Sequence, residues 1–202
     1  MIPAIVLAAG DSTRMGSPKA LLPAPDGRTF VAAIVRSFAA AGVRDIVIVT
    51  GRDHEKVVEA LHGDHPPVGP RFARNPEPSR GQLSSLWVGM DACVGPQTDG
   101  VLVTLVDVPL IAPATVMAVL DTWRRTGAPI VRPAIGDRHG HPVLFDRAMF
   151  GELRDASLET GAKAVVRRHE HELVNVPVSD ERSLIDVDTP NDYSSLRRTF
   201  DF

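Results

Sequence analysis

The stretch IPAIVLAAGDSTRMGSPK, residues 2–19, is an apolar run that leads directly into a loop of glycines, hydroxyls and cations. A short apolar, β-branched run without polar alternation is typical of a parallel strand covered on both faces. The run stops at Gly10-Asp11 and no basic segment precedes it, so it is too short for a signal peptide or for the ~20 apolar residues of a membrane span. We therefore expect a buried strand followed by a ligand-binding loop.

The rest of the chain continues the alternation of strand and helix. Further long strands are expected over residues 45–50 and 101–106, and helices over residues 29–41, 54–61 and 83–94. This order predicts a doubly wound α/β sheet, in which ligands bind beyond the carboxyl ends of the strands. Shorter strands over 129–135, 142–145 and 173–178, with a helix over 159–169, suit a mixed sheet edge or a small lobe. No linker divides the chain, so we expect one domain over residues 1–202.

The composition limits the class of protein. The 202 residues include 22 Lys and Arg against 25 Asp and Glu, a formal net charge of −3. Such a chain lacks the basic surface that nucleic acid or an anionic membrane requires, so neither is an expected partner. The one cysteine, Cys93, can form no internal disulfide, which suits a reducing cytoplasm, and its apolar surroundings predict a core position midway along a helix.

The loop after the first strand carries the groups that a triphosphate needs. Gly10 and Gly16 permit backbone conformations closed to other residues, Ser12 supplies a hydroxyl, and Arg14 and Lys19 supply positive charge. The spacing is neither that of a Walker A motif nor G-x-G-x-x-G, which weakens kinase-type and dinucleotide interpretations. The alternative is a glycine-containing turn with surface charges.

Acidic residues follow two other segments. Asp107 comes directly after the third long strand, where a carboxylate would face the same crevice and suit Mg²⁺; the alternative is that it caps a helix beginning near Pro113. Asp186 and Asp188 are two residues apart, so in an extended segment both would point to one side, toward the same cation. Thr189-Pro190 is a helix-start signal and is expected to serve structure.

Two further segments are candidates for substrate contacts. Gly81 precedes polar residues, among them Ser85, at the expected N-terminus of a helix, where a phosphate or a base edge could bind. The alternative is a helix capped by serine. His141 precedes the strand at 142–145 and could touch a ligand, although a loop histidine is more often a surface or packing residue.

Five motifs together closely resemble the MobA-like nucleotidyltransferases, and among these the molybdenum cofactor cytidylyltransferases. They are Leu7-Ala8-Ala9-Gly10-x-Ser12-x-Arg14-Met15-Gly16-x-x-Lys19, Gly81-x-x-x-Ser85-Leu86, Asp107-x-Pro109, Gly140-His141-Pro142 and Asp186-x-Asp188-Thr189-Pro190. The resemblance runs from residue 2 to about residue 198. It implies a nucleotide-diphospho-sugar transferase fold, a Rossmann-like three-layer α/β/α sandwich with a mainly parallel mixed sheet.

The resemblance also implies an activity: transfer of CMP from CTP to the terminal phosphate of molybdopterin, with release of pyrophosphate and with Mg²⁺ as cofactor. A transient contact with a molybdoenzyme or its maturation factor is an expected partner interaction. Nucleotide contacts are implied at Leu7, Ala8, Ala9, Gly10, Ser12, Arg14, Gly16, Lys19, Gly81 and Ser85. Catalytic roles are implied for Arg14, Lys19 and Asp107, metal ligation for Asp107, Asp188 and Asp186, and an acceptor contact is expected for His141.

The choice of nucleotide is inferred from two positions. Guanylyltransferases of this family usually have Leu-Ala-Gly-Gly where this chain has Leu7-Ala8-Ala9-Gly10, and an Asp where it has Pro18, so both differences favour CTP over GTP. Val108 counts against the choice of CTP, because cytidylyltransferases commonly have Gln at this position. The alternatives are use of GTP, use of a sugar phosphate or another cofactor precursor as acceptor, a non-catalytic cofactor chaperone, and a nicotinamide-dependent oxidoreductase.

Overall fold

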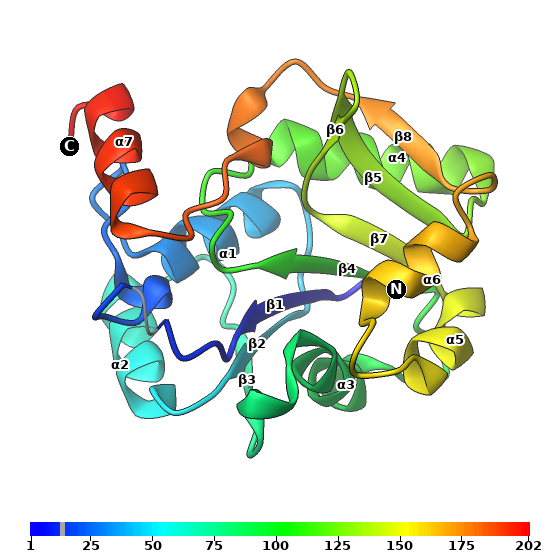
Figure 1. Ribbon diagram of the computed structural model, residues 1–202, viewed down its shortest axis with the longest axis horizontal. Helices are drawn as coiled ribbons and strands as arrows, with labels where there is room; N and C mark the ends of the chain where they lie inside the picture. Colours follow the sequence, from blue (N-terminus) through cyan, green and yellow to red (C-terminus); the bar gives the residue numbers. More distant parts are fainter. Residues whose placement is uncertain (13–14) are drawn as a thin grey trace.

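The computed structural model describes residues 1–12 and 15–202, and within them the central element is a mixed sheet of eight strands (Figure 1). The strands are β1 (Ala4–Ala8), β2 (Ile46–Thr50), β3 (Arg71–Arg74), β4 (Gly100–Leu105), β5 (Ile130–Ile135), β6 (Arg138–His139), β7 (Val143–Asp146) and β8 (Val174–Pro177). They lie in the order β3-β2-β1-β4-β7-β5-β6, with β8 paired to β5. The expected α/β class and the mixed sheet are confirmed.

The strand order switches sides at β1, which lies between β2 and β4. The chain leaves β1 for β2 and β3 on one side, all parallel, and then returns to β4 on the other side of β1. Beyond β4 the sheet becomes mixed, because β7 runs antiparallel to both β4 and β5. Leu7 of β1 lies opposite Leu105 of β4, so the loops that follow these two strands meet at one crevice.

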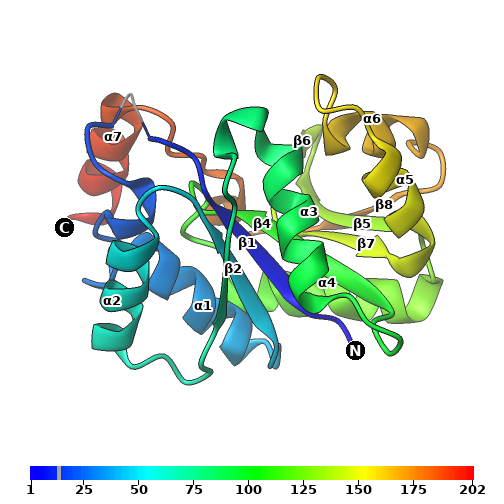
Figure 2. The same ribbon diagram turned by 90° about the horizontal axis from the view of Figure 1, so that it is seen from below.

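Helices cover both faces of the sheet, so the three-layer sandwich is also confirmed. They are α1 (Phe30–Ala40), α2 (His54–Asp64), α3 (Gln82–Cys93), α4 (Pro113–Thr126), α5 (Phe150–Asp155), α6 (Ala162–Arg168) and α7 (Pro190–Phe200). Side chains of β1 alternate between two apolar cores: Ala4 and Val6 pack with α1, α2, α4 and α7, whereas Ile5 and Leu7 pack with α3, α5 and α6. Figures 1 and 2 show α1 and α4 on one face and α3 and α5 on the other.

Local signals explain most helix boundaries. Thr29 is the N-cap of α1, and its side chain accepts a hydrogen bond from the Ala32 amide. Thr189 and Asp192 form a capping box at the start of α7, as expected for structural residues. Helix α6 begins at Ala162, later than the predicted residue 159, because Gly161 adopts a positive φ of 65° directly before it.

Cys93 does not lie midway along its helix, as expected, but is the last residue of α3 and is half-buried. It still packs at the edge of the α3 core, and this burial raises the pKa of its thiol to about 12. Such a pKa leaves little of the nucleophilic thiolate at neutral pH. Among the described residues, no helix combines the length and the apolar character that crossing a membrane would require.

Candidate functional site

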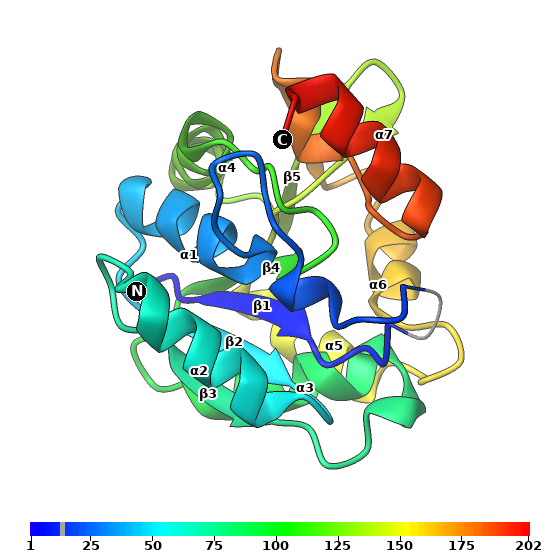
Figure 3. The same cartoon turned by 90° about the vertical axis from the view of Figure 1, so that its left-hand side faces the viewer.

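A cavity of about 370 Å³ lies where β1 and β4 end, and its lining includes Ala8, Leu105 and the residues that follow them. Figure 3 shows the arrangement of the sheet and its helices from this side of the molecule. Most of the predicted nucleotide and metal residues line the cavity: Leu7, Ala8, Ala9, Gly10, Ser12, Lys19, Gly81, Ser85, Asp107 and Asp188. Because these residues come from four separate segments, the tertiary fold brings together motifs that are up to 181 positions apart, from Leu7 to Asp188. Gly16 and Asp186 do not line the cavity, and Arg14 lies outside the described residues.

Three charged side chains meet in this cavity. The Nζ atom of Lys19 donates to Oδ1 of Asp188 at 2.6 Å and to Oδ2 of Asp107 at 3.3 Å. Lys19 and Asp107 are mostly withdrawn from solvent, with 12% and 21% of their side chains exposed. The other oxygen of Asp107, Oδ1, is buried and has no hydrogen-bond partner among the described residues. A buried acceptor without a partner is costly, so this carboxylate is suited to a cation or another donor.

The structure excludes the alternative role of Asp107 as a helix cap. Helix α4 has Ala112 at its N-cap, with no side-chain hydrogen bond. The backbone of Asp107 instead ties the C-terminal segment to the crevice, because its carbonyl accepts a 2.8 Å hydrogen bond from the amide of Val187. Val187 is fully buried between Asp186 and Asp188, which anchors both aspartates beside Asp107.

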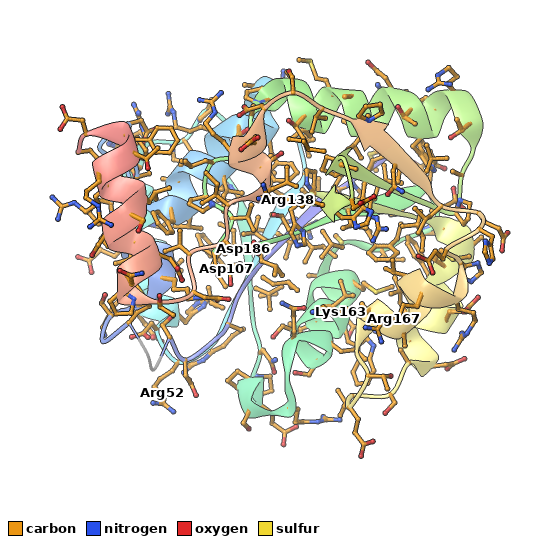
Figure 4. The ribbon with its side chains drawn as sticks, turned by 45° about the horizontal axis from the view of Figure 1, so that its top comes forward. Arg52, Asp107, Arg138, Lys163, Arg167 and Asp186 are labelled. Atoms are coloured by element: carbon orange, nitrogen blue, oxygen red, sulfur yellow. The ribbon has the colours of Figure 1, made fainter. Side chains whose placement is uncertain are left out.

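Asp186 takes a different position from the one expected for it. Residues 186–188 are not a strand, and only Asp188 reaches the cavity lining. Figure 4 shows Asp186 next to Asp107, and partial desolvation together with the Asp107 charge raises the pKa of Asp186 above its ordinary range. Among the described residues, no group of three or more acidic, histidine or cysteine side chains is placed to hold a metal ion.

The first loop is shaped by Ser12 more than by Gly10. Ser12 has a positive φ of 47°, its carbonyl accepts from the Met15 amide, and its Oγ accepts a 3.0 Å hydrogen bond from the Lys19 amide. Gly16 adopts the left-handed conformation expected of a loop glycine, with φ of 67°. Gly10 does not, and the expectation is wrong there: a Cβ atom at Gly10 would meet no atom within 4 Å, so the residue leaves open space at the cavity wall.

The two serines in the first turn of α3 are hydrogen-bonded to a residue that was not identified from the sequence. Asn75 is 3% exposed, and its side-chain amide donates to the hydroxyls of Ser84 and Ser85, both at 2.9 Å. Its Oδ1 accepts from the Glu77 amide. Gly81, with φ of 96°, is the N-cap of α3 without any side-chain cap, so the alternative of a serine-capped helix is wrong. Only the position of Asn75 directly after β3 could have pointed to it.

The loop after β2 was also missed, although it follows a parallel strand as the other site loops do. Gly51, Arg52 and Asp53 line the cavity, and the exposed Arg52 forms an ion pair with Asp11 at 3.6 Å. Gly51 packs against the first loop so closely that a Cβ atom there would lie 2.5 Å from the carbonyl oxygen of Ala9. The position of Ala9 is therefore set by a glycine 42 residues later.

His141 lies outside this cavity and lines a second one, of about 510 Å³, which adjoins the first. The two cavities share Leu7, Gln82 and Leu105 in their walls. The imidazole is half-buried, with its Nδ1 3.4 Å from the carbonyl oxygen of Val103. Removal from water lowers the pKa of His141 below its ordinary value, so the ring is neutral at physiological pH. A neutral ring can donate one hydrogen bond and accept one.

Similarity to known proteins agrees with this geometry. A model of the MobA-like NTP transferase domain matches residues 4–173. The chain is 29% identical over 196 residues to a probable molybdenum cofactor guanylyltransferase of Mycobacterium avium (strain 104), which covers 95% of this chain and 93% of that protein. It is 31% identical over 192 residues to nicotine blue oxidoreductase of Paenarthrobacter nicotinovorans, covering 92% and 91%.

The bifunctional protein GlmU of Rhizobium etli (strain CIAT 652) is 35% identical over 153 residues, which is 74% of this chain but 32% of GlmU. The chain thus spans about a third or less of the length of the GlmU relatives that it matches.

Solved structures show the same fold over the whole chain. Rv0371c from Mycobacterium tuberculosis H37Rv superposes with a TM-score of 0.81 at 31% identity, covering 100% of this chain and 99% of that one. The complex of Rv0371c with manganese gives a TM-score of 0.72 at 28% identity, covering 98% of both chains. The family match, the shared fold and the assembled loop motifs lead to one conclusion: the chain belongs to the MobA-like NTP transferase family.

Proposed function

We propose that this protein transfers CMP from CTP to the terminal phosphate of molybdopterin and releases pyrophosphate. The observation that carries the proposal is the meeting of Lys19, Asp107 and Asp188 in a cavity walled by the first loop. That loop, with Ser12 holding the Lys19 backbone, supports the β- and γ-phosphates in the proposal. A cytoplasmic location accompanies it, supported by the single cysteine.

In the proposed reaction an oxygen of the acceptor phosphate forms a bond to the α-phosphorus of CTP. The bond between the α-phosphorus and the bridging oxygen breaks, and pyrophosphate leaves with the electron pair. The acceptor oxygen is already anionic, so no strong general base is required, and the protein contributes alignment and charge neutralisation. Lys19 stabilises the negative charge that develops on pyrophosphate. Arg14 shares this role in the proposal, by its place in the sequence of the same loop.

The residues present fit a divalent cation of the Mg²⁺ type. Asp107 offers a buried oxygen without a hydrogen-bond partner, and Asp188 offers a second carboxylate on the same wall. Mg²⁺ is commonly held by one or two carboxylates together with phosphate oxygens and water, so a third protein ligand is not required. When bound, such a cation neutralises phosphate charge. Manganese in the complex of Rv0371c supports a divalent metal in this family.

The choice of CTP is supported by the wall next to Ala9. Ala9 is 4% exposed and lines the cavity, and the close approach of Gly51 leaves its backbone no room to move aside. In the proposal the cytosine base binds beside Ala9, where alanine in place of the glycine of guanylyltransferases leaves less space and so favours the smaller pyrimidine. The relatives named guanylyltransferases make GTP the alternative to be tested.

Measuring pyrophosphate release with each of the four nucleoside triphosphates, with and without molybdopterin, tests the proposal. We expect release with CTP, Mg²⁺ and molybdopterin together. Asp107→Asn should reduce it by about 10²-fold or more, whereas Asp121→Asn, on the exposed face of α4, should not. Release with GTP alone would overturn the choice of base, and CTP binding without any release would favour a cofactor chaperone.

The similarity to nicotine blue oxidoreductase supports a second candidate, the nicotinamide-dependent oxidoreductase named among the alternatives above. The first loop lacks the G-x-G-x-x-G pattern of dinucleotide-binding folds, which counts against it. Oxidation of NADH or NADPH, followed by absorbance in the presence of FMN or a quinone dye, separates the two candidates. The nucleotidyltransferase proposal predicts no such turnover.

A further inference from the structure

The second cavity differs chemically from the first. It extends from the shared residues Leu7, Gln82 and Leu105 toward α6, and its volume of about 510 Å³ can hold a ligand larger than a phosphate. Its walls are predominantly apolar and come from the sheet and from the helices that cover one face of it. The apolar residues are Leu83 and Leu86 of α3, Val103 of β4, Val143 and Phe145 of β7, and Leu158 and Val166 near α6.

The apolar walls limit which kinds of chemical group the central part of a ligand can carry. Hydroxyl groups placed against these walls would lose their hydrogen bonds to water and gain none, which is unfavourable for each hydroxyl group. A polyhydroxylated sugar is therefore a poor fit to the inner part of this cavity. A flat ring system fits better, because its faces are apolar and its edges can bond to a few polar groups such as His141.

Positive charge collects at the α6 side of the same cavity. Lys163 and Arg167 are one helical turn apart on α6 and both line it, as does Arg132 of β5; Glu159 is the one acidic residue in this lining. Among the described residues, neither Lys163 nor Arg167 forms an ion pair, whereas the adjacent Arg168 pairs with Glu152. Figure 4 shows Lys163 and Arg167 next to each other. Two like charges at this spacing repel each other, and a bound anion would relieve the repulsion.

We infer that the acceptor carries a second anionic group, remote from the phosphate that reacts, and that Lys163 and Arg167 bind this group while the apolar walls hold a flat ring between the two ends. The inference rests on the proposed function, which fixes the end of the acceptor that lies in the first cavity. Its reacting phosphate points toward Asp107 in the first cavity, and its other end points toward α6. Lys163 and Arg167 thereby select against sugar phosphates that carry no anionic group other than the reacting phosphate.

A pair of fluorescent probes tests the chemistry of the cavity without any enzymatic assay. Both 8-anilinonaphthalene-1-sulfonate and N-phenyl-1-naphthylamine have the same apolar rings, but only the first carries an anion. We expect the wild-type protein to bind the sulfonate, and the Lys163→Ala/Arg167→Ala double variant to bind it roughly 10- to 100-fold more weakly. The uncharged probe should bind both proteins equally.

Arg168→Ala is the matched control, because it removes a charge from the same helix without altering the cavity lining. Its affinity for the sulfonate should equal that of the wild type. Thermal melts of all variants check that the probe reports a cavity in the folded protein and not exposed core. Failure of the wild type to bind the sulfonate, or equal affinity of the wild type and the double variant, would overturn the inference.

Kinetics distinguish failure of this inference from failure of the proposed function. With CTP and molybdopterin, the double variant should show an acceptor KM at least about tenfold higher and an unchanged KM for CTP. Restoring charge with Lys163→Arg/Arg167→Lys should recover most of the acceptor affinity. If the wild type transfers no nucleotide but the probe results hold, the proposed function fails and the anion site stands; normal acceptor KM in the double variant with active transfer would refute the anion site alone.

Discussion

The Nζ atom of Lys19 lies 2.6 Å from Oδ1 of Asp188, across 169 positions of sequence. The same ammonium group reaches Asp107, so one lysine holds two carboxylates that would otherwise repel each other. These are the same carboxylates that the proposed function assigns to a divalent cation. In the free protein Lys19 therefore compensates the negative charge of the two carboxylates in the cavity.

Replacing Lys19 tests this compensation of charge. Lys19→Ala should lower turnover by about 10²- to 10³-fold, because a preorganised donor to the leaving pyrophosphate is lost. It should also lower the free energy of unfolding by about 1 kcal/mol without metal, a small value because Asp188 is half-exposed. Mg²⁺ should raise the melting temperature more in the variant than in the wild type. Arg124→Ala, which breaks a surface pair with Asp121, is the control, and turnover of Lys19→Ala at the wild-type rate would refute the role.

Asn75 should prove important for both stability and nucleotide binding. Asn75→Ala leaves two buried serine hydroxyls and the Glu77 amide without their partner, which should cost about 1–3 kcal/mol in unfolding free energy. Because Ser85 lines the cavity, the KM for the nucleotide should rise as well. Urea denaturation and pyrophosphate release measure the two effects. Gln97→Ala, at an exposed position, should change neither.

Two glycines of the site should respond to alanine in different ways. At Gly51 the added Cβ would lie 2.5 Å from the Ala9 carbonyl oxygen, so the two loops must move apart, and we expect a loss of about 1–3 kcal/mol in unfolding free energy. At Gly10 the Cβ meets open space, so stability should change by less than about 0.5 kcal/mol. Gly10→Ala should instead weaken nucleotide binding, measured by calorimetry, because the methyl group enters the cavity. Equal loss of stability in both variants would contradict this account.

The contact between His169 and Glu152 should make stability depend on pH. The Glu152 carboxylate, 2.7 Å from Nε2, raises the pKa of His169 above its ordinary 6.5, and His169 and Arg168 lower the pKa of Glu152 below its ordinary 4.5. The contribution of His169 is complete below pH 6.5 and is lost as pH rises through its raised pKa, while that of Glu152 is lost as pH falls below 4.5.

The melting temperature of His169→Gln should therefore fall furthest below that of the wild type between pH 4.5 and 6.5. The difference should shrink by about pH 9. His171→Gln, at an exposed position nearby, should follow the wild type at every pH. A constant difference between His169→Gln and the wild type across this range would mean that the imidazole acts through packing and not through its charge.

Much of the site could be predicted because parallel strands place the loops that follow them at one edge of the sheet. Lys19 and Asp107 follow β1 and β4, and both were expected in the same crevice, where the structure places them. Asn75 and Gly51 could not be predicted in the same way, since their roles are to hold other residues through contacts between distant segments. The short elements β3, β6 and α5 were missed because too few residues establish a period.

The sequence by itself determined the long strands β1, β2 and β4, since their continuous apolar runs can be satisfied only inside a sheet covered by helices. It also determined which loops carry cations and carboxylates. Only the tertiary structure decided that Asp188 and not Asp186 faces the cavity, because buried Val187 is tied to the Asp107 carbonyl. It likewise decided that a second, apolar and cationic cavity adjoins the first, because that cavity arises where α3, α6 and the strands β4 and β7 pack together, and such packing leaves no local pattern in the chain.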